Sequence, residues 1–123
     1  MAMQAIPVLR IFDETKAREF YLDYLGMSLN WEHRFEVNTP IYMQVSWGEF
    51  KLHLSEHVAD CSPGAKVFVA TDELDAIFKP LKEKNYKYLR PQIEQASWGT
   101  RTLTLIDPFS NQIMFNEETK DSP

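Results

Sequence analysis

The side chains able to do chemistry in this sequence are few and scattered: three histidines and one cysteine. His53 and His57 are four residues apart, a spacing that lets two histidines bind one metal ion on a helix. Here they flank the predicted end of a strand, where that spacing brings nothing together. Cys61 has no neighbouring base in the sequence that could activate its thiol. We therefore predict no catalytic residue and no metal ligand from these residues alone.

Flat aromatic side chains are the second group with chemical potential, because they bind planar molecules by stacking. Trp98 precedes Gly99 at the start of a predicted strand, where it can be a stacking surface at the mouth of a groove or a core tryptophan. Trp31 and Phe35 alternate on one face of another predicted strand, where the pattern slightly favours a core position over a ligand contact.

The elements that position these residues follow one order twice. Residues 5–12 are mostly apolar and predict a buried strand, and Asp13 is a good N-cap for the helix that follows. Apolar residues recur on one helix face, and Gly26 is expected to end the helix. Three strands are predicted next, at residues 28–37, 41–47 and 50–55. The first of them alternates and should have one buried face.

The second half repeats this order. Residues 66–71 predict a strand, and Asp72 can cap a second helix in which Pro80 should introduce a kink or an early end. Residues 88–95, 100–106 and 112–116 are three further strand candidates. We therefore predict an α+β protein, a single domain of residues 1–123 built from two βαβββ modules at about 5–56 and 65–118.

A turn at Gly48 and Glu49 fixes which residues share a face of the predicted hairpin. Trp47 would pair with Phe50, and the apolar face would pack on the helix. The opposite face would line a cavity with Tyr42, Gln44, Ser46, Lys51, His53 and Ser55, and by the same alternation with Arg10, Lys66, Phe68, Gln112, Met114 and Asn116. The predicted ligand-binding residues are Trp98, Trp31, Phe35, His53, Tyr42, Lys66, Phe68, Met114 and Arg10.

The composition excludes several classes of protein. A net charge of −5 argues against a nucleic-acid binder, which needs a basic face to neutralise phosphates. No apolar run approaches the roughly 20 residues that span a bilayer, so no membrane segment is expected. The first residues lack the charged and apolar regions of a signal peptide. A single cysteine excludes an intrachain disulfide, and we expect a cytoplasmic protein.

Several segments together resemble a known family. The start of the chain carries Ala5-Ile6-Pro7-Val8-Leu9, Asp13, Glu19-Phe20-Tyr21 and Leu25-Gly26-Met27. Trp98-Gly99-Thr100-Arg101 is similar to a Trp-Gly-x-Arg segment, and Ile106-Asp107-Pro108 with Asn111 and Phe115 is similar to an Asp-Pro-x-Gly-Asn hairpin and its final strand. Over residues 5–118 the chain resembles the bleomycin-resistance branch of the glyoxalase/bleomycin-resistance/dioxygenase (vicinal oxygen chelate) superfamily.

The resemblance implies two curled sheets with their helices outside. It also implies a homodimer with ligand grooves at the subunit boundary, often formed by exchange of arms, and Pro7 stands at the proline of the exchanged strand. Ser110 replaces the turn glycine of the family. Superfamily enzymes hold a metal at four positions that correspond to Ile6, His53, Lys66 and Met114, of which only His53 is a suitable ligand. We therefore expect neither a metal nor another cofactor.

These observations favour a metal-independent small-molecule binding protein. By resemblance it would sequester a bleomycin-type or other planar antibiotic and so give resistance without chemistry, although Arg10, Lys51 and Lys66 do not suit a cationic drug. The alternative is a lyase, isomerase or dioxygenase-type enzyme of the same superfamily, with Lys66 or His53 as its acid–base group. A dimer that binds a metabolite or a protein partner is a third possibility.

Overall fold

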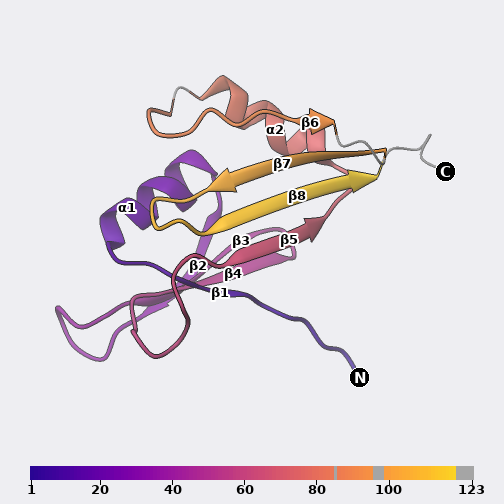
Figure 1. The fold of residues 1–123 in the computed structure, drawn as a ribbon. Coiled ribbons are helices and arrows are strands. Elements are labelled where there is room, and N and C mark those ends of the chain that lie inside the picture. Colours follow the sequence, from indigo (N-terminus) through magenta and orange to yellow (C-terminus); the bar gives the residue numbers. More distant parts are fainter. Residues whose placement is uncertain (85, 96–98, 119–123) are drawn as a thin grey trace. The chain divides into compact units, whose positions relative to one another are not determined.

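A computed structural model of the protein describes residues 1–84, 86–95 and 99–118. The fold is α+β, and the chain divides into two compact units. The first comprises Met1–Ala65 together with Asp107–Asn111, and the second comprises Lys66–Ile106 with the chain from Gln112 onward. Each unit contains one four-stranded mixed sheet, and Figure 1 shows the elements of both.

The first unit has the βαβββ order that the sequence predicts. Its elements are β1 (Val8–Arg10), α1 (Glu14–Arg18), η1 (Glu19–Tyr24), β2 (Ser28–His33), β3 (Tyr42–Trp47) and β4 (Phe50–Ser55). The strand order is β1-β4-β3-β2, with β1 parallel to β4 and the other pairs antiparallel. The sheet is open at both edges, in place of the curled sheet that the resemblance implied.

The second unit repeats the order with β5 (Lys66–Ala70), α2 (Leu74–Glu83), β6 (Glu94–Gln95), β7 (Thr100–Ile106) and β8 (Gln112–Glu118). Its strand order, β5-β8-β7-β6, is again open, and β5 is parallel to β8. The predicted strand at residues 88–95 is reduced to its last two residues. The prediction of two βαβββ modules in an α+β fold is confirmed.

The first helix forms where capping and periodicity predict it. The Asp13 carboxylate accepts a hydrogen bond from the Lys16 N–H at 3.0 Å, which satisfies one of the free donors of the first turn. The helix then widens into a π-turn, in which the Leu25 N–H reaches the Phe20 carbonyl at 2.9 Å. Gly26 ends it with a φ of 75°, a conformation that glycine adopts without strain. The apolar face is buried, as predicted, and consists of Ala17, Phe20, Tyr21, Tyr24 and Leu25.

The hairpin register follows from the position of its turn. Trp47 pairs with Phe50, Val45 with Leu52 and Met43 with Leu54, all as predicted. The aliphatic side chains of this face are fully buried, and the Trp47 indole N–H donates to the Leu25 carbonyl at 3.1 Å, which ties the sheet to the end of the helix. The opposite face is left for polar side chains.

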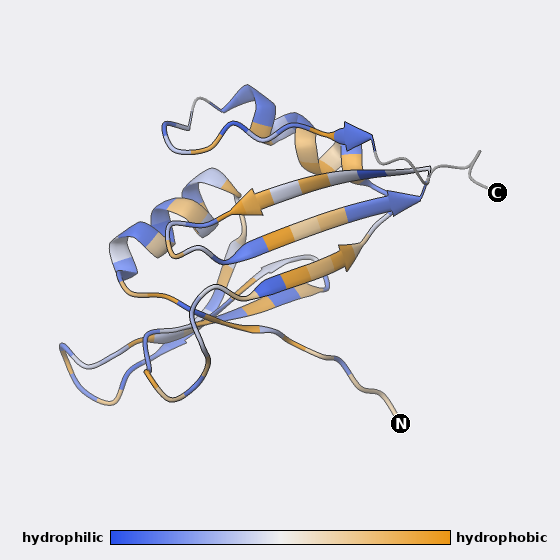
Figure 2. Ribbon diagram, viewed as in Figure 1, coloured by the Kyte–Doolittle hydropathy of each residue, from blue (hydrophilic) through white to orange (hydrophobic). Residues whose placement is uncertain are grey.

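The helix of the second unit contacts β7 and β8 of its sheet. Hydrophobic residues recur along the helix and these strands in Figure 2. The helix contributes Leu74 and Leu81, and the buried sheet residues are Leu103, Leu105, Ile113 and Phe115. Pro80 does not end the helix early, because the helix continues to Glu83. Asp72 does not cap it either: the Glu117 carboxylate on β8 accepts the Leu74 N–H at 3.1 Å and takes that role from a distance in sequence.

The predicted strand at residues 28–37 differs most from the structure. It ends at His33, because a turn follows in which the Thr39 N–H donates to the Glu36 carbonyl and Asn38 has a φ of 70°. All six residues of β2 are exposed, so the predicted buried face is wrong. As an edge strand, β2 has a neighbour on one side only, and nothing in the first unit covers it.

The segment Asp107–Asn111 lies in sequence between two strands of the second unit, yet it belongs to the first. The Asn111 side-chain amide donates to the Arg10 carbonyl at 2.8 Å, and its oxygen accepts the Ala65 N–H at 3.1 Å. Ser110 keeps the turn with a φ of 69°, the left-handed conformation for which the family uses glycine. The order of elements in the sequence predicts this segment in the second module, whereas in the structure it packs with the first unit.

Candidate functional site

Strand register gathers the predicted cavity residues of the first unit on one face of the sheet. Tyr42 lies opposite Ser55, Gln44 opposite His53, and Ser46 opposite Lys51. On the other side of β4, Arg10 is the partner of Ser55. Since paired residues point to the same side of a sheet, these side chains form one polar face.

A β-bulge adds Trp31 to this face. Leu29 pairs with Val45, whose side chain is in the core, but Trp31 pairs with Gln44 on the polar face. Asn30 is the extra residue between them, and one extra residue reverses which side of the sheet the following side chains occupy. Trp31 and His33 therefore share the face of Tyr42 and His53. The alternation within the strand carries no sign of this reversal.

Trp31, Tyr42 and His53 form a contiguous aromatic cluster, which we call the aromatic platform. The Trp31 and Tyr42 rings are nearly parallel, at 8°, with centroids 5.9 Å apart. His53 meets both rings edge-on, with centroids 5.2 Å from Trp31 and 5.1 Å from Tyr42. Trp31 is 42% exposed although it is a large apolar side chain. An exposed, flat indole held by its neighbours is suited to stacking on a planar molecule.

A series of hydrogen bonds connects the Tyr42 and His53 side chains of the platform to Gln44 and Asn30. The Tyr42 hydroxyl is 2.7 Å from Nδ1 of His53, and Nε2 of His53 is 2.9 Å from Oε1 of Gln44. The Gln44 amide then donates to Oδ1 of Asn30 at 3.0 Å. Burial lowers the pKa of His53 below its ordinary value of 6.5, which favours the neutral imidazole. Asn30 and Gln44 were not among the predicted ligand-binding residues.

Arg10 and Phe35 have different surroundings from the platform. The Arg10 guanidinium is buried over the Phe12 ring, 4.5 Å from its centroid, and donates to the Ser55 carbonyl at 3.5 Å. Its charge is therefore engaged within the protein. Phe35 follows β2, is 80% exposed, and has its ring against His33 with centroids 5.3 Å apart. The structure thus brings Trp31, Tyr42 and His53 together and leaves Phe35 apart from that cluster.

Three further predicted residues share one face of the second sheet. Phe68 pairs with Met114, and Lys66 pairs with Gln112 two residues earlier. Phe68 is 61% exposed beside an open cavity of about 660 Å³, which is lined by Phe68, Ala70, Thr71, Asp72, Asn116 and Glu118. Lys66 and Met114 are not among the residues that line it. Trp98 lies outside the described residues, and its stacking role remains a prediction.

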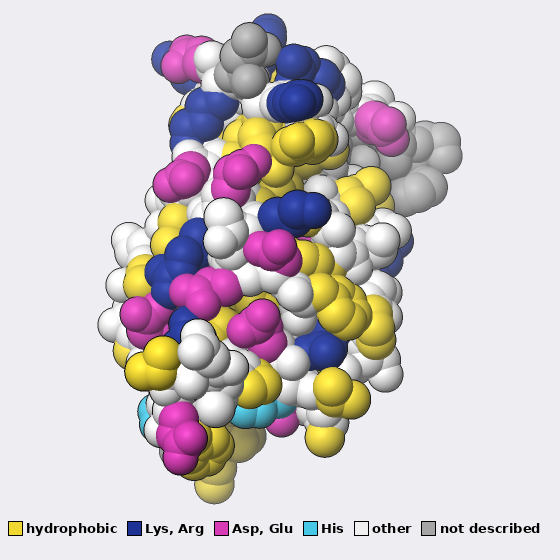
Figure 3. Space-filling view, turned by 90° about the vertical axis from the view of Figure 1, so that its left-hand side faces the viewer, with side chains coloured by type: hydrophobic (Ala, Val, Ile, Leu, Met, Phe, Trp, Pro, Cys, Tyr) yellow, Lys and Arg dark blue, Asp and Glu magenta, His cyan; other side chains and the backbone are white. Residues whose placement is uncertain are grey.

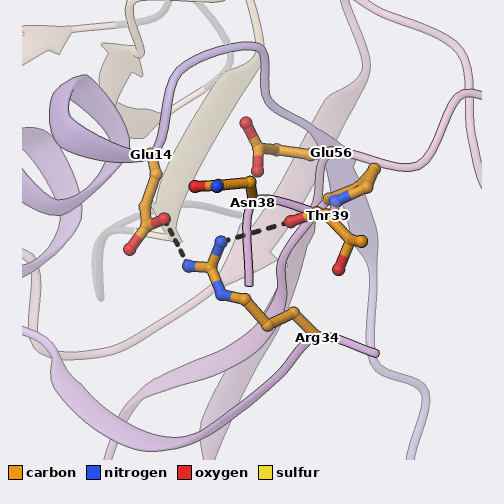
Figure 4. Close-up of a pocket in the computed structure, with 6 residues that line it drawn as sticks. Glu14, Arg34, Asn38, Thr39 and Glu56 are labelled. Atoms are coloured by element: carbon orange, nitrogen blue, oxygen red, sulfur yellow. Dashed lines mark hydrogen bonds and ion pairs between the residues drawn. The ribbon is translucent and has the colours of Figure 1, made fainter. Parts of the chain in front are cut away.

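The first unit also has a polar pocket of about 380 Å³, which Figure 4 shows. Arg34 donates to a Glu14 carboxylate oxygen at 2.5 Å and to the Thr39 carbonyl at 3.2 Å. Glu56 accepts the Ile41 N–H at 3.0 Å. The charged groups of this pocket thus bond to one another and to the backbone. These hydrogen bonds connect the loop after β2 to the helix and to the sheet.

The residues at the superfamily's metal positions do not fit a metal ion. Ile6 has no donor atom, a protonated Lys66 repels cations, and Met114 suits only soft metals. Both ring nitrogens of His53 are already hydrogen-bonded, to Tyr42 and Gln44. Among the described residues, no group of three or more histidine, cysteine, aspartate or glutamate side chains is placed to hold a metal ion.

The surface charge is mixed. Figure 3 shows acidic and basic side chains interspersed on one face, in keeping with the modest net charge of −5. One network in the first unit pairs Glu14 with both Arg18 and Arg34, and Arg18 also with Glu32. Within the described ranges, no helix has the length and apolar character needed to cross a membrane.

The protein belongs to the glyoxalase superfamily. A family model described as "Glyoxalase superfamily protein" matches residues 1–122, nearly the whole chain. This agrees with the paired βαβββ order and confirms the resemblance seen in the sequence. A comparison with curated proteins found no match.

Solved structures with the same fold include drug-binding proteins. A bleomycin-binding protein complexed with bleomycin is 19% identical, with a TM-score of 0.69 over 95% of this chain and 99% of that one. A bleomycin resistance determinant encoded on the transposon Tn5 is 18% identical, with a TM-score of 0.69 over 95% and 98%. TnmS3, an antibiotic binding protein from Streptomyces sp. CB03234, is 22% identical, with a TM-score of 0.63 over 97% and 99%.

Proposed function

We propose that this protein binds a planar small molecule, of the bleomycin type or another planar antibiotic, and sequesters it without a chemical reaction. The observation that carries the proposal is the aromatic platform, in which an exposed Trp31 indole is stacked beside Tyr42 and braced by His53. An ordinary polar surface does not offer a ligand a flat apolar area of this kind. The drug-binding proteins that share the fold support the same conclusion.

The geometry favours binding over catalysis. A general base needs a free lone pair within reach of the substrate, and both nitrogens of His53 are engaged by Tyr42 and Gln44. Lys66, the other acid–base candidate, is exposed and is not among the residues that line the cavity of the second unit. Sequestration requires neither group to react. It would protect a cytoplasmic target by lowering the concentration of free drug.

Calorimetric titration tests this function. The protein would be titrated with metal-free bleomycin, copper-loaded bleomycin and an anthracycline, and the bound drug would be recovered and weighed by mass spectrometry. We expect saturable binding of at least one drug, which is recovered unchanged. The absence of heat with all three drugs at high micromolar protein would contradict the proposed sequestration of antibiotics. Recovery of a drug with altered mass would indicate an enzyme instead.

We also propose that the protein is a homodimer. The edge strand β2 and the loop after it expose Trp31, Phe35 and Val37, the last two at 80% and 84%. Large apolar side chains that are exposed along one edge strand and the loop after it favour an interaction surface. Sedimentation velocity should show a dimer at tens of micromolar. A monomer throughout that range would contradict this proposal and leave the platform open to solvent on a single chain.

A further inference from the structure

We infer that the aromatic platform selects planar ligands that carry an N–H or O–H donor at the edge facing the Tyr42 hydroxyl. This inference rests on the proposed function, because it assumes that a ligand stacks on the platform. It goes further by naming the chemical group that the ligand must have. The direction of each hydrogen bond in the chain from Asn30 to Tyr42 leads to this group.

The donor and acceptor roles in this series of hydrogen bonds are set at Asn30. The side-chain amide of Gln44 donates through Nε2 to Oδ1 of Asn30 at 3.0 Å. The other end of that amide, Oε1, is an acceptor without a proton, and it lies 2.9 Å from Nε2 of His53. A hydrogen bond at this distance therefore requires a proton on Nε2. Gln44 thus selects one of the two neutral tautomers of His53.

The tautomer determines the direction of the next bond. Because His53 is partly buried, the neutral imidazole is favoured, and with a proton on Nε2 its Nδ1 has only a lone pair. The Tyr42 hydroxyl is 2.7 Å from Nδ1, so the hydroxyl is the donor of this bond. Tyr42 has only one O–H proton, and it is donated to Nδ1 of His53.

The oxygen of Tyr42 is then available to a ligand only as an acceptor. Within the described part of the chain, the hydroxyl makes no second hydrogen bond. Burial raises the pKa of the Tyr42 hydroxyl, and the negative charge of Asp60 adds to that rise. The same charge repels a ligand oxygen that carries lone pairs or an anion and attracts a donor. A ligand donor is thus favoured twice, by hydrogen bonding and by electrostatics.

A matched pair of probes tests this inference. 2-Naphthol and 2-methoxynaphthalene have the same planar ring system and differ by an O–H donor. Each would be titrated into labelled protein while the Trp31 indole signal is followed by NMR. We expect 2-naphthol to bind about two- to tenfold more tightly, the range of one neutral hydrogen bond. The Tyr42→Phe variant should bring the ratio of the two affinities to about one.

The control is Tyr88→Phe, which removes the hydroxyl of an exposed tyrosine in the second unit and should leave the ratio as in the wild type. Equal affinities of the two probes in the wild type, or tighter binding of the ether, would overturn the inference while the proposed function stands. If neither probe moves the Trp31 signal, planar molecules do not stack on the platform and the inference fails, while the calorimetric titration decides the proposed function separately.

A second measurement tests the hydrogen-bond chain without any ligand. Long-range ¹H–¹⁵N correlation spectra distinguish the protonated from the unprotonated ring nitrogen of a histidine. We expect His53 to carry its proton on Nε2 at neutral pH, and Gln44→Leu to abolish this preference. His33→Gln and His57→Gln variants would identify the His53 signals. A proton on Nδ1 in the wild type would make Tyr42 a donor to the ligand and would overturn the inference.

Discussion

Replacing Asp107 by alanine is expected to lower the free energy of unfolding by about 3–5 kcal/mol, because it leaves several buried donors without an acceptor. Asp107 is only 5% exposed. One oxygen accepts the Phe109 and Asn111 N–H groups, each at 2.8 Å. The other accepts the Tyr21 hydroxyl at 2.6 Å and the Asn111 side-chain amide at 2.9 Å. Burial raises the pKa of Asp107, while these four hydrogen bonds oppose that rise.

Urea unfolding followed by circular dichroism measures this loss, with the slope of the transition checked for each variant. Asp72→Ala is the matched control, because Asp72 is an exposed aspartate in the second unit, and its removal should change the free energy of unfolding by less than about 0.5 kcal/mol. A loss at position 107 no larger than that of the control would mean that the turn does not hold the first unit together.

The second large effect is expected on binding. Trp31→Ala should weaken binding of the drug that gives heat in the calorimetric experiment by about 1–3 kcal/mol, which is the usual loss when an aromatic anchor of a binding surface is removed. The fold should remain, because Trp31 lies on an exposed edge strand and contributes little to the core. Affinity and melting temperature would be measured on the same preparation.

Tyr88→Ala serves as the control for binding, since it removes another exposed aromatic ring, 69% exposed, from the second unit. It should leave the affinity unchanged. A Trp31→Ala variant that melts normally and binds as the wild type does would place the ligand elsewhere, and the exposed Phe68 beside the cavity of the second unit would be the next position to test. A large decrease in the melting temperature would show instead that Trp31 is part of the core.

Local signals in the sequence were sufficient for much of the framework. Asp13 caps the first helix, and Gly26 ends it, because capping and a positive φ depend on one residue and its near neighbours. The short turn at Gly48 fixes the pairing of β3 with β4, since a hairpin register is set by its turn. That register alone is enough to place Tyr42 and His53 on one face of the sheet.

Tertiary structure decided what depends on residues distant in the sequence. The bulge at Asn30 moved Trp31 to the polar face, and this depends on how β2 pairs with β3 rather than on the alternation within β2. Asp107 follows a strand of the second unit, yet its carboxylate bonds to Tyr21 of the first, 86 residues away in sequence. The sequence by itself determined the order of elements and the faces of the hairpin, because each depends on contacts between neighbours in the chain. The composition of the aromatic platform and the place of Asp107 depend on non-local pairing, which only the folded chain defines.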